Sequence, residues 1–215
     1  MNKAVLIRHG LTEANKKHLY CGSTDIPLSQ EGREALGKLK ETVYQAAEGK
    51  TWQAAEDKIL QAAEEKCSGD APALLYVTSG LKRCTETLHI LFSDVEETVM
   101  PAFSEMDFGA FEMHSYEELK EDPDYQTWIT GDNEANVTPG GESGLQMQER
   151  TDRAFDELLS QEKDVILVTH GGVIAQLMDR FFPEEGRNRY EWQPACGRGY
   201  EIVFQENSAV GYSRI

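Results

Sequence analysis

Three short apolar runs constrain the fold of this 215-residue chain more than any other feature. They are residues 4–7 (AVLI), 74–77 (LLYV) and 165–169 (VILVT), and each ends in a polar turn that contains glycine. Continuous apolar runs of this length are typical of strands that are buried on both faces. Because stretches with helical periodicity separate them, the sequence predicts an α/β fold with a largely parallel sheet.

The stretches between these runs predict the helices that cover the sheet. Ser29 can cap the first of them, and Ser143 opens a long one. The expected helices span about 30–48, 52–66, 81–92, 143–161 and 173–181, and shorter strands are expected near 97–100 and 200–204. The predicted fold class is α/β with three layers, in which a mostly parallel central sheet has helices on both faces and a lid-like insertion.

We expect residues 1–215 to form a single domain. Glycine and proline interrupt an excursion at about 103–142, which is typical of a lid. An extended helical segment at about 45–70 has a charged surface, and we expect it to cover the sheet edge without taking part in chemistry. Three aromatic side chains of the excursion are expected to pack the lid onto the domain, namely Tyr116, Tyr125 and Trp128.

The charge balance excludes two classes of partner. The chain has 38 Asp and Glu residues against 21 Lys and Arg, a formal net charge of −17. Such a surface repels nucleic acid and anionic membranes, so neither is an expected partner. No apolar run reaches the roughly 18 residues of a membrane span, and the start has no signal-peptide cleavage site. We therefore expect a cytoplasmic protein, and the sequence leaves its oligomeric state open.

Neither cysteine nor histidine shows the spacing of metal ligands. The four cysteines are far apart in the sequence and include no C-x-x-C pair, so free thiols are expected. The five histidines lack an H-x-x-x-H spacing. The sequence predicts no metal site and no cofactor.

Polar residues follow three strands of the predicted sheet. The three segments are Arg8-His9-Gly10, Thr78-Ser79-Gly80 with Arg83 close behind, and His170-Gly171-Gly172. The carboxyl ends of the strands form the ligand crevice of an open α/β sheet, so these side chains should converge. Arginine forks suit phosphate oxygens, and histidine supplies a nucleophile candidate. The sequence therefore predicts a phosphate pocket with a nucleophile in it, a small-molecule phosphate ester being the expected ligand.

The same segments resemble the motifs of one known family. Residues 8–15 (RHGLTEAN) match the R-H-G-x-T-x-x-N pattern of the histidine phosphatase superfamily, also called the phosphoglycerate mutase-like family. Further similar segments are Gly22, 25–29 (DIPLS), 79–87 (SGLKRCTET), 105–112 (EMDFGAFE), 139–143 (PGGES) and 169–173 (THGGV). They occur in family order from residue 3 to about residue 178, which makes the resemblance highly specific.

The resemblance implies a catalytic role for five residues. His9 would attack phosphorus and become phosphohistidine, and Glu105 would protonate the leaving oxygen and then accept a proton from water. Arg8, Arg83 and His170 would hold the equatorial oxygens, so that no metal is needed. The implied substrate-binding residues are Gly10, Thr12, Asn15, Cys21, Gly22 and Gly171.

The sequence departs from the family pattern at two of these segments. Cys84 stands where alanine is usual, and Met113 stands where glycine is usual. Two further carboxylates are alternative proton donors, Glu86 and Glu112. Glu86 lies one helical turn after Arg83, so we expect it to pair with Arg83 or to be solvated.

The resemblance leaves three functions open. The favoured one is a phosphomonoesterase that acts through phosphohistidine on a small phosphorylated metabolite. The alternatives are a phosphoglycerate-type phosphomutase and a non-catalytic sensor of phosphorylated ligands. A mutase needs extra cations for a second anionic group, but residues 106–136 contain one base, Lys120, among nine acids. Three arginines could reverse this preference by folding toward the pocket, namely Arg187, Arg189 and Arg198.

The chain length and the Glu-x-Asp-Phe-Gly segment that begins at Glu105 point to one branch of the family. They resemble the branch that removes phosphate from α-ribazole phosphate in cobalamin assembly. Fold and pocket do not fix the substrate, so α-ribazole phosphate is one candidate among several.

Overall fold

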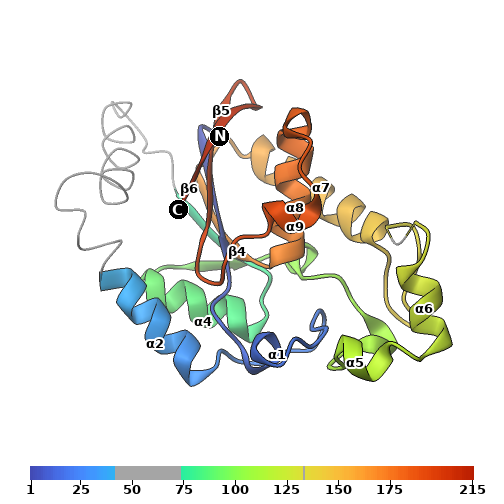
Figure 1. Ribbon diagram of the computed structural model, residues 1–215. Coiled ribbons are helices and arrows are strands. Elements are labelled where there is room, and N and C mark those ends of the chain that lie inside the picture. The colour runs from blue at the N-terminus through green and yellow to red at the C-terminus, as the bar shows by residue number, and fades with distance from the viewer. Residues whose placement is uncertain (42–73, 133) are drawn as a thin grey trace, which may run out of the picture.

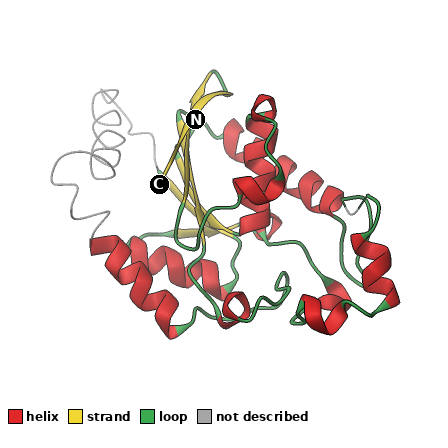
Figure 2. Ribbon diagram, viewed as in Figure 1, coloured by secondary structure: helices red, strands yellow, loops and turns green. Residues whose placement is uncertain are grey.

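The computed structural model describes residues 1–41, 74–132 and 134–215. A six-stranded sheet with the strand order β3-β2-β4-β1-β5-β6 stands at its centre (Figures 1 and 2). The strands are β1 (Lys3–Arg8), β2 (Leu75–Thr78), β3 (Glu97–Val99), β4 (Val165–Thr169), β5 (Gly199–Gln205) and β6 (Ser208–Arg214). The three apolar runs are thus strands, and the α/β fold class is confirmed.

Strands β1 to β4 run parallel, and this direction brings their carboxyl ends to one edge of the sheet. Arg8 at the end of β1 stands opposite Thr169 at the end of β4, and Thr78 at the end of β2 stands opposite Val168. Strands β5 and β6 continue the sheet, β5 antiparallel to β1 and β6 antiparallel to β5. The polar segments that follow β1, β2 and β4 therefore start from the same edge.

Helices cover both faces of the sheet, as predicted. Figure 1 shows α2 (Gln30–Leu39) and α4 (Lys82–Leu91) on one side, and α7 (Gly144–Ser160) and α8 (Gly171–Phe181) on the other. Side chains of a strand point alternately to the two faces. On β1, Val5 and Ile7 belong to the buried cluster under α2 and α4, whereas Ala4 and Leu6 belong to the cluster under α7 and α8.

Serine caps begin the long helices where the sequence predicts them. The Ser29 hydroxyl accepts a hydrogen bond from the Gly32 N–H at 3.0 Å, which fixes the start of α2. Ser143 and Gln146 form a reciprocal capping box at the start of α7. The predicted helix over about 30–48 corresponds to α2, and its part beyond residue 41 lies outside the described residues. The stretch at 52–66 and the segment at about 45–70 also lie outside them.

The excursion after β3 consists of short helical pieces that pack on an aromatic cluster. They are η2 (Pro101–Phe103), η3 (Gly109–Phe111), α5 (Tyr116–Leu119) and α6 (Pro123–Ile129). Tyr125 and Trp128 of α6 are buried, and their rings contact that of Tyr20, as the packing interpretation predicts. The Tyr20 and Tyr125 hydroxyls also hydrogen bond to each other at 2.6 Å, whereas Tyr116 is exposed.

Three features of the fold differ from the prediction or add to it. Strand β6 is absent from the prediction; Glu206 and Asn207 both have positive φ angles in the tight turn that joins it to β5. Helix α8 begins at Gly171, two residues earlier than expected. The φ of Met113 is +61°, a left-handed conformation that glycine adopts without strain, which accounts for glycine in the family pattern.

In the described part of the chain, no helix is long and apolar enough to cross a bilayer.

Candidate active site

The structure brings His9 and His170 together at the carboxyl edge of the sheet. His9 follows β1, and its backbone N–H donates to the Thr169 carbonyl at the end of β4, at 2.9 Å. His170 follows Thr169 as the N-cap residue of α8. The two imidazole rings lie edge to face with centroids 5.2 Å apart, and both are buried. His9 and His170 therefore lie together, as expected from their positions at the ends of neighbouring strands.

One hydrogen bond sets the protonation of the His9 ring. Its Nδ1 lies 2.7 Å from the Gly10 carbonyl oxygen, and a carbonyl only accepts, so Nδ1 carries the hydrogen. In the neutral ring Nε2 then keeps its lone pair. Burial, followed by the nearby charges of Arg83 and Arg8, lowers the pKa of His9 to about 3 despite this hydrogen bond. His9 is consequently a neutral ring whose Nε2 can act as a nucleophile at physiological pH.

His170 is fixed by three neighbours. The Arg83 Nε donates to His170 Nδ1 at 3.3 Å, so the hydrogen of a neutral ring sits on Nε2. That Nε2 lies 3.0 Å from the Ser79 hydroxyl and 3.4 Å from the Cys84 thiol. Burial and the charge of Arg83 hold the pKa of His170 well below its usual range. The departure at Cys84 thus places a thiol against a site residue.

Arg83 is 1 % exposed and reaches the site from the first turn of α4. Besides its bond to His170, its guanidinium donates to the Gly22 carbonyl at 2.6 Å and to the Thr24 carbonyl at 2.8 Å. A guanidinium has five N–H groups, and these contacts use three of them. Arg83 therefore anchors the loop at 22–24 and retains donors for an anion.

Arg8 reaches the site from the end of β1. Its Nη1 donates to the Pro194 carbonyl at 2.9 Å, and its buried Nε has no hydrogen-bond partner among the described residues. Glycine at position 171 leaves room for this approach, since a Cβ there would make tight contacts of 3.1 Å with Arg8 Cζ and 3.3 Å with Gln193 Oε1. An unpartnered buried N–H is costly, so a bound anion would stabilise it.

The Glu105 carboxylate lies against the start of α8, the helix that begins directly after His170. Its Oε2 accepts the Gly172 N–H at 2.9 Å, and its Oε1 accepts the Met106 N–H at 3.1 Å. A Cβ on residue 172 would lie 2.3 Å from Oε1, so any other residue here would displace the carboxylate from this position. Glu105 is therefore placed by the backbone of the same helix that His170 caps.

The two alternative carboxylates have structural partners. Glu112 accepts hydrogen bonds from the backbone N–H groups of Gly22, Ser23 and Thr24 at 2.9 to 3.2 Å. It therefore stabilises the same loop to which Arg83 donates hydrogen bonds. Glu86 pairs with Arg33 at 2.9 Å. The expected pairing of Glu86 with Arg83 is wrong, because the Arg83 guanidinium turns inward to the buried site.

The remaining predicted residues have hydrogen-bond partners within the protein. Thr12 and Asn15 form the capping box of α1 (Glu13–Lys16), in which Asn15 Oδ1 accepts from both the N–H and the hydroxyl of Thr12. The Gly10 N–H donates to the Thr87 hydroxyl, and the Cys21 thiol lies 3.7 Å from the Thr24 carbonyl. A direct contact of these residues with a ligand remains a prediction.

A cavity of about 170 Å³ opens beside Glu105. Its walls are largely aromatic and apolar, with rings from the loop after α1, from the excursion and from the segment after α8. The side chains that give it this character are Tyr20, Met106, Phe108, Trp128, Met147 and Tyr190, and Arg189 and Gln193 add polar groups. Glu105 and Gly172 line this cavity, so it lies next to the start of α8, the helix whose N-cap residue is His170.

Several residues of the site are absent from the sequence prediction. Gly172 is part of the His-Gly-Gly segment, so its position at a strand end is the signal that could have found it. Tyr190 and Gln193 come from the segment after α8, where no strand end or motif marks them, whereas Arg189 was named from the sequence only as an arginine that could fold toward the pocket. Among the residues that the structure describes, no group of three or more His, Cys, Asp or Glu side chains could hold a metal ion.

Fold and site together define an α/β protein of the phosphoglycerate mutase-like type. Residues 4–48 and 55–210 match the sequence pattern described as the histidine phosphatase superfamily, branch 1. The chain belongs to this superfamily, which confirms the resemblance of its motifs.

Similar proteins agree with this membership. A curated protein of Salmonella typhimurium, named adenosylcobalamin/α-ribazole phosphatase, is 29% identical over 181 residues, which cover 81% of this chain and 77% of that protein. The α-ribazole phosphatase structure from Shigella flexneri has a TM-score of 0.72 and 25% identity, with 97% of this chain and 93% of that chain covered. A phosphoglycerate mutase structure from Thermus thermophilus has a TM-score of 0.67 at 24% identity, with 98% and 97% covered, and shows the shared fold.

Proposed function

We propose that this protein is a phosphomonoesterase that transfers a phosphoryl group from a small ester to His9 and then to water. The observation that carries the proposal is the neutral His9 ring, whose Nδ1 is bound to the Gly10 carbonyl and whose Nε2 keeps its lone pair. Its neighbours Arg8 and Arg83 supply the positive charge that an equatorial phosphoryl oxygen needs.

The proposed reaction has two steps, the transfer of the phosphoryl group to His9 and its transfer to water. In the first, His9 Nε2 forms a bond to phosphorus while the ester P–O bond breaks, and Glu105 donates a proton to the leaving alkoxide. In the second, water attacks the phosphohistidine, the P–N bond breaks, and Glu105 accepts the proton of the water. The position of Glu105 in the wall of the 170 Å³ cavity supports this role, because a leaving group in that cavity would lie beside the carboxylate.

The cavity supports an ester with an apolar or aromatic remainder. Its aromatic walls would bury such a group and stack on it. The relatives from Salmonella typhimurium and Shigella flexneri are both named as α-ribazole phosphatases, so α-ribazole phosphate is the first compound to test.

A phosphomutase is the less favoured function, because the cations it would need are occupied or distant. Lys120 pairs with Glu117 at 2.7 Å on the exposed surface of α5. Arg187 pairs with Glu185 and stacks on the ring of Trp192. Of the three arginines considered from the sequence, Arg189 alone is among the described residues that line the cavity, and it pairs with Glu134 at 2.9 Å.

Hydrolysis of p-nitrophenyl phosphate in the presence of EDTA tests the proposed function. We expect wild-type protein to release phosphate and His9→Ala to lose at least about a thousandfold in kcat, because the nucleophile is gone. His89→Ala, which removes a half-exposed imidazole on α4, is the matched control and should retain activity. Brief reaction with a radiolabelled ester should also leave acid-labile, base-stable phosphate on the peptide that contains His9.

Two results would contradict the proposal. Binding of phosphate esters without turnover would make the protein a sensor. Faster isomerisation of 3-phosphoglycerate than hydrolysis of any ester would make it a mutase.

A further inference from the structure

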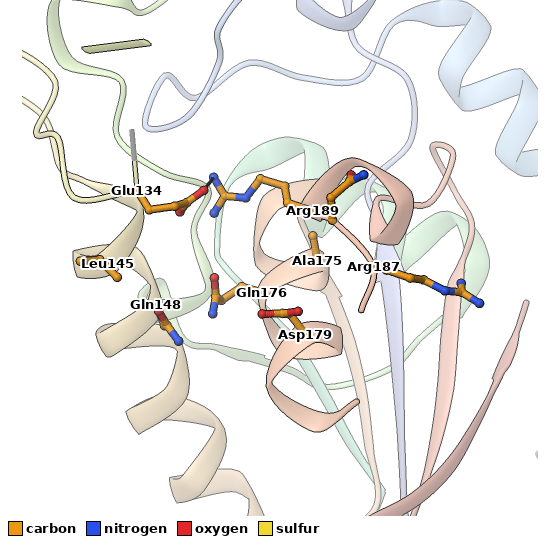
Figure 3. Close-up of a pocket in the computed structure, with 9 residues that line it drawn as sticks. Glu134, Leu145, Gln148, Ala175, Gln176, Asp179, Arg187 and Arg189 are labelled. Atoms are coloured by element: carbon orange, nitrogen blue, oxygen red, sulfur yellow. Dashed lines mark ion pairs between the residues drawn. The ribbon is translucent and has the colours of Figure 1, made fainter. Parts of the chain in front are cut away.

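A second cavity, of about 300 Å³, lies along helices α7 and α8 (Figure 3), and it shares one lining residue with the 170 Å³ cavity, which we call the ester cavity. Gly172 of α8 lines the ester cavity, whereas Gln176 and Asp179, one and two turns further along α8, line the second one. Arg189 lines both cavities. Its side chain is therefore the boundary between the ester cavity and the second cavity.

An ion pair holds the Arg189 side chain in this position. Its Nη1 lies 2.9 Å from Glu134 Oε1, and Figure 3 shows the guanidinium directed toward that carboxylate. The neighbouring Arg187 points the other way, toward Glu185 and Trp192. Arg189 is thus the arginine whose charge bears on the ester cavity, and Glu134 is its partner.

The first turn of α7 places Glu134 opposite Arg189. The Glu134 carbonyl accepts the Leu145 N–H at 2.9 Å, and a Cβ on Gly144 would lie 2.1 Å from Glu134 Oε2. The carboxylate therefore lies against the amino end of a 17-residue helix, where the helix dipole favours negative charge. Glycine at position 144 is what allows this close contact.

The ion pair between Arg189 and Glu134 determines the net charge next to the part of the ester that would lie in the ester cavity. Arg189 is the one basic residue, and Glu105 the one acidic residue, among the described residues that line the ester cavity. Glu105 carries the proton that the proposed first step transfers to the leaving group, so the Glu134 carboxylate is the charge that balances the Arg189 guanidinium. A carboxylate or second phosphate on the ester would gain no attraction from the paired Arg189, whereas an unpaired Arg189 would attract it.

We propose that Glu134 is a specificity-determining residue that neutralises Arg189 and thereby restricts the enzyme to phosphate esters whose remainder carries no negative charge. This inference rests on the proposed phosphatase function. The ion pair between Glu134 and Arg189 at the cavity wall would then be one cause of the preference for uncharged remainders. The small number of basic residues in the excursion would be another.

Two matched esters test the proposal. Glycerol 3-phosphate and 3-phosphoglycerate have the same carbon chain and differ in a hydroxymethyl group against a carboxylate. We expect Glu134→Gln to raise kcat/KM for phosphate release from 3-phosphoglycerate, relative to glycerol 3-phosphate, about three- to fivefold at low salt. The gain should shrink at high ionic strength, and the double variant Glu134→Gln/Arg189→Gln should lose it.

Glu149→Gln is the control for net charge. It removes the same charge from an exposed ion pair with Arg153 on α7, at 2.7 Å, and should leave the ratio of the two esters unchanged. An unchanged ratio in Glu134→Gln, or an equal rise in Glu149→Gln, would overturn the inference while His9-dependent hydrolysis of p-nitrophenyl phosphate still stood. Absence of that hydrolysis in the wild-type protein would instead overturn the proposed function.

Discussion

Gly172 links the backbone of α8 to the carboxylate that we propose as the proton donor. Its N–H binds Glu105, and a Cβ at this position would lie 2.3 Å from Glu105 Oε1. We expect Gly172→Ala to displace the carboxylate and to lower kcat/KM for glycerol 3-phosphate, which reports the first step, about a hundredfold. The loss of kcat/KM for p-nitrophenyl phosphate should be much smaller, because p-nitrophenolate leaves without a proton. Steady-state kinetics with both esters checks the expectation.

A glycine elsewhere provides the control for this substitution. A Cβ added to Gly37 of α2 would meet no atom of a neighbouring element within 4 Å, so Gly37→Ala should leave both rates unchanged. Equal losses of kcat/KM for the two esters in Gly172→Ala would indicate a general disturbance of the site and would contradict the proton-donor role given to Glu105.

Residues at the strand ends could be predicted from the sequence, and residues placed by tertiary contacts could not. Arg8, His9 and His170 lie at the ends of buried strands, so the direction of the sheet already places them together. The tautomer of His9 depends on a carbonyl that the sequence does not orient. Arg189 lines the cavity because of its bond to Glu134, far earlier in the chain, and no periodicity marks that pairing.

At the scale of elements, Arg150 of α7 connects the helix to the segment that carries Glu105. Its guanidinium donates to the carbonyls of Ala102, Ser104 and Glu105 at 2.7, 2.8 and 3.0 Å, and it is paired with Glu142. A planar fork is needed to reach these acceptors together, and lysine lacks one. Arg150 is therefore a positioning residue for the proposed proton donor.

We expect Arg150→Lys to lower kcat about tenfold with little change in KM, because the position of the donor changes and the cavity does not. The loss of kcat/KM should be larger for glycerol 3-phosphate than for p-nitrophenyl phosphate. Arg153→Lys, at an exposed pair on the same helix, should have no effect. A rise in KM without a fall in kcat would show that Arg150 serves substrate binding instead.

The main elements were predictable because their patterns are local. Buried strands read as apolar runs, and Ser29 and Ser143 mark the starts of α2 and α7. Strand β6 was not predictable in the same way: it alternates weakly and lies at the sheet edge, with only its tight turn as a signal. The helical pieces of the excursion are too short to show a period, so their aromatic packing emerges only in three dimensions.

At the scale of the whole molecule, the two buried histidines link folding to pH. Burial lowers the pKa of both rings, so between the lowered values and the ordinary value of 6.5 the unfolded chain binds more protons than the folded one. Stability should therefore be fully present above pH 6.5 and fall as the pH drops below it. For His9 the expected loss of unfolding free energy from about pH 7 to about pH 5 is about 2 kcal/mol. His170 adds a loss in the same direction.

Urea unfolding at about pH 7 and about pH 5 measures this dependence. His9→Asn should reduce the difference between the two pH values, because asparagine does not titrate. His18→Asn, at an exposed position with a positive φ that asparagine tolerates, is the control and should leave the difference as in the wild type. Equal stability of the wild type at both pH values would contradict the buried, neutral state of the two rings.

The hydrogen bond between His9 Nδ1 and the Gly10 carbonyl also decides which isomer of phosphohistidine can form. Because Nδ1 donates its hydrogen to the Gly10 carbonyl, phosphorus would be attached at Nε2, the nitrogen remote from the main chain, which gives the tele isomer. The tele form is the more slowly hydrolysed of the two free isomers. Turnover would then depend on the protein's own activation of water, and a trapped adduct would be identifiable by reagents that distinguish tele from pros phosphohistidine.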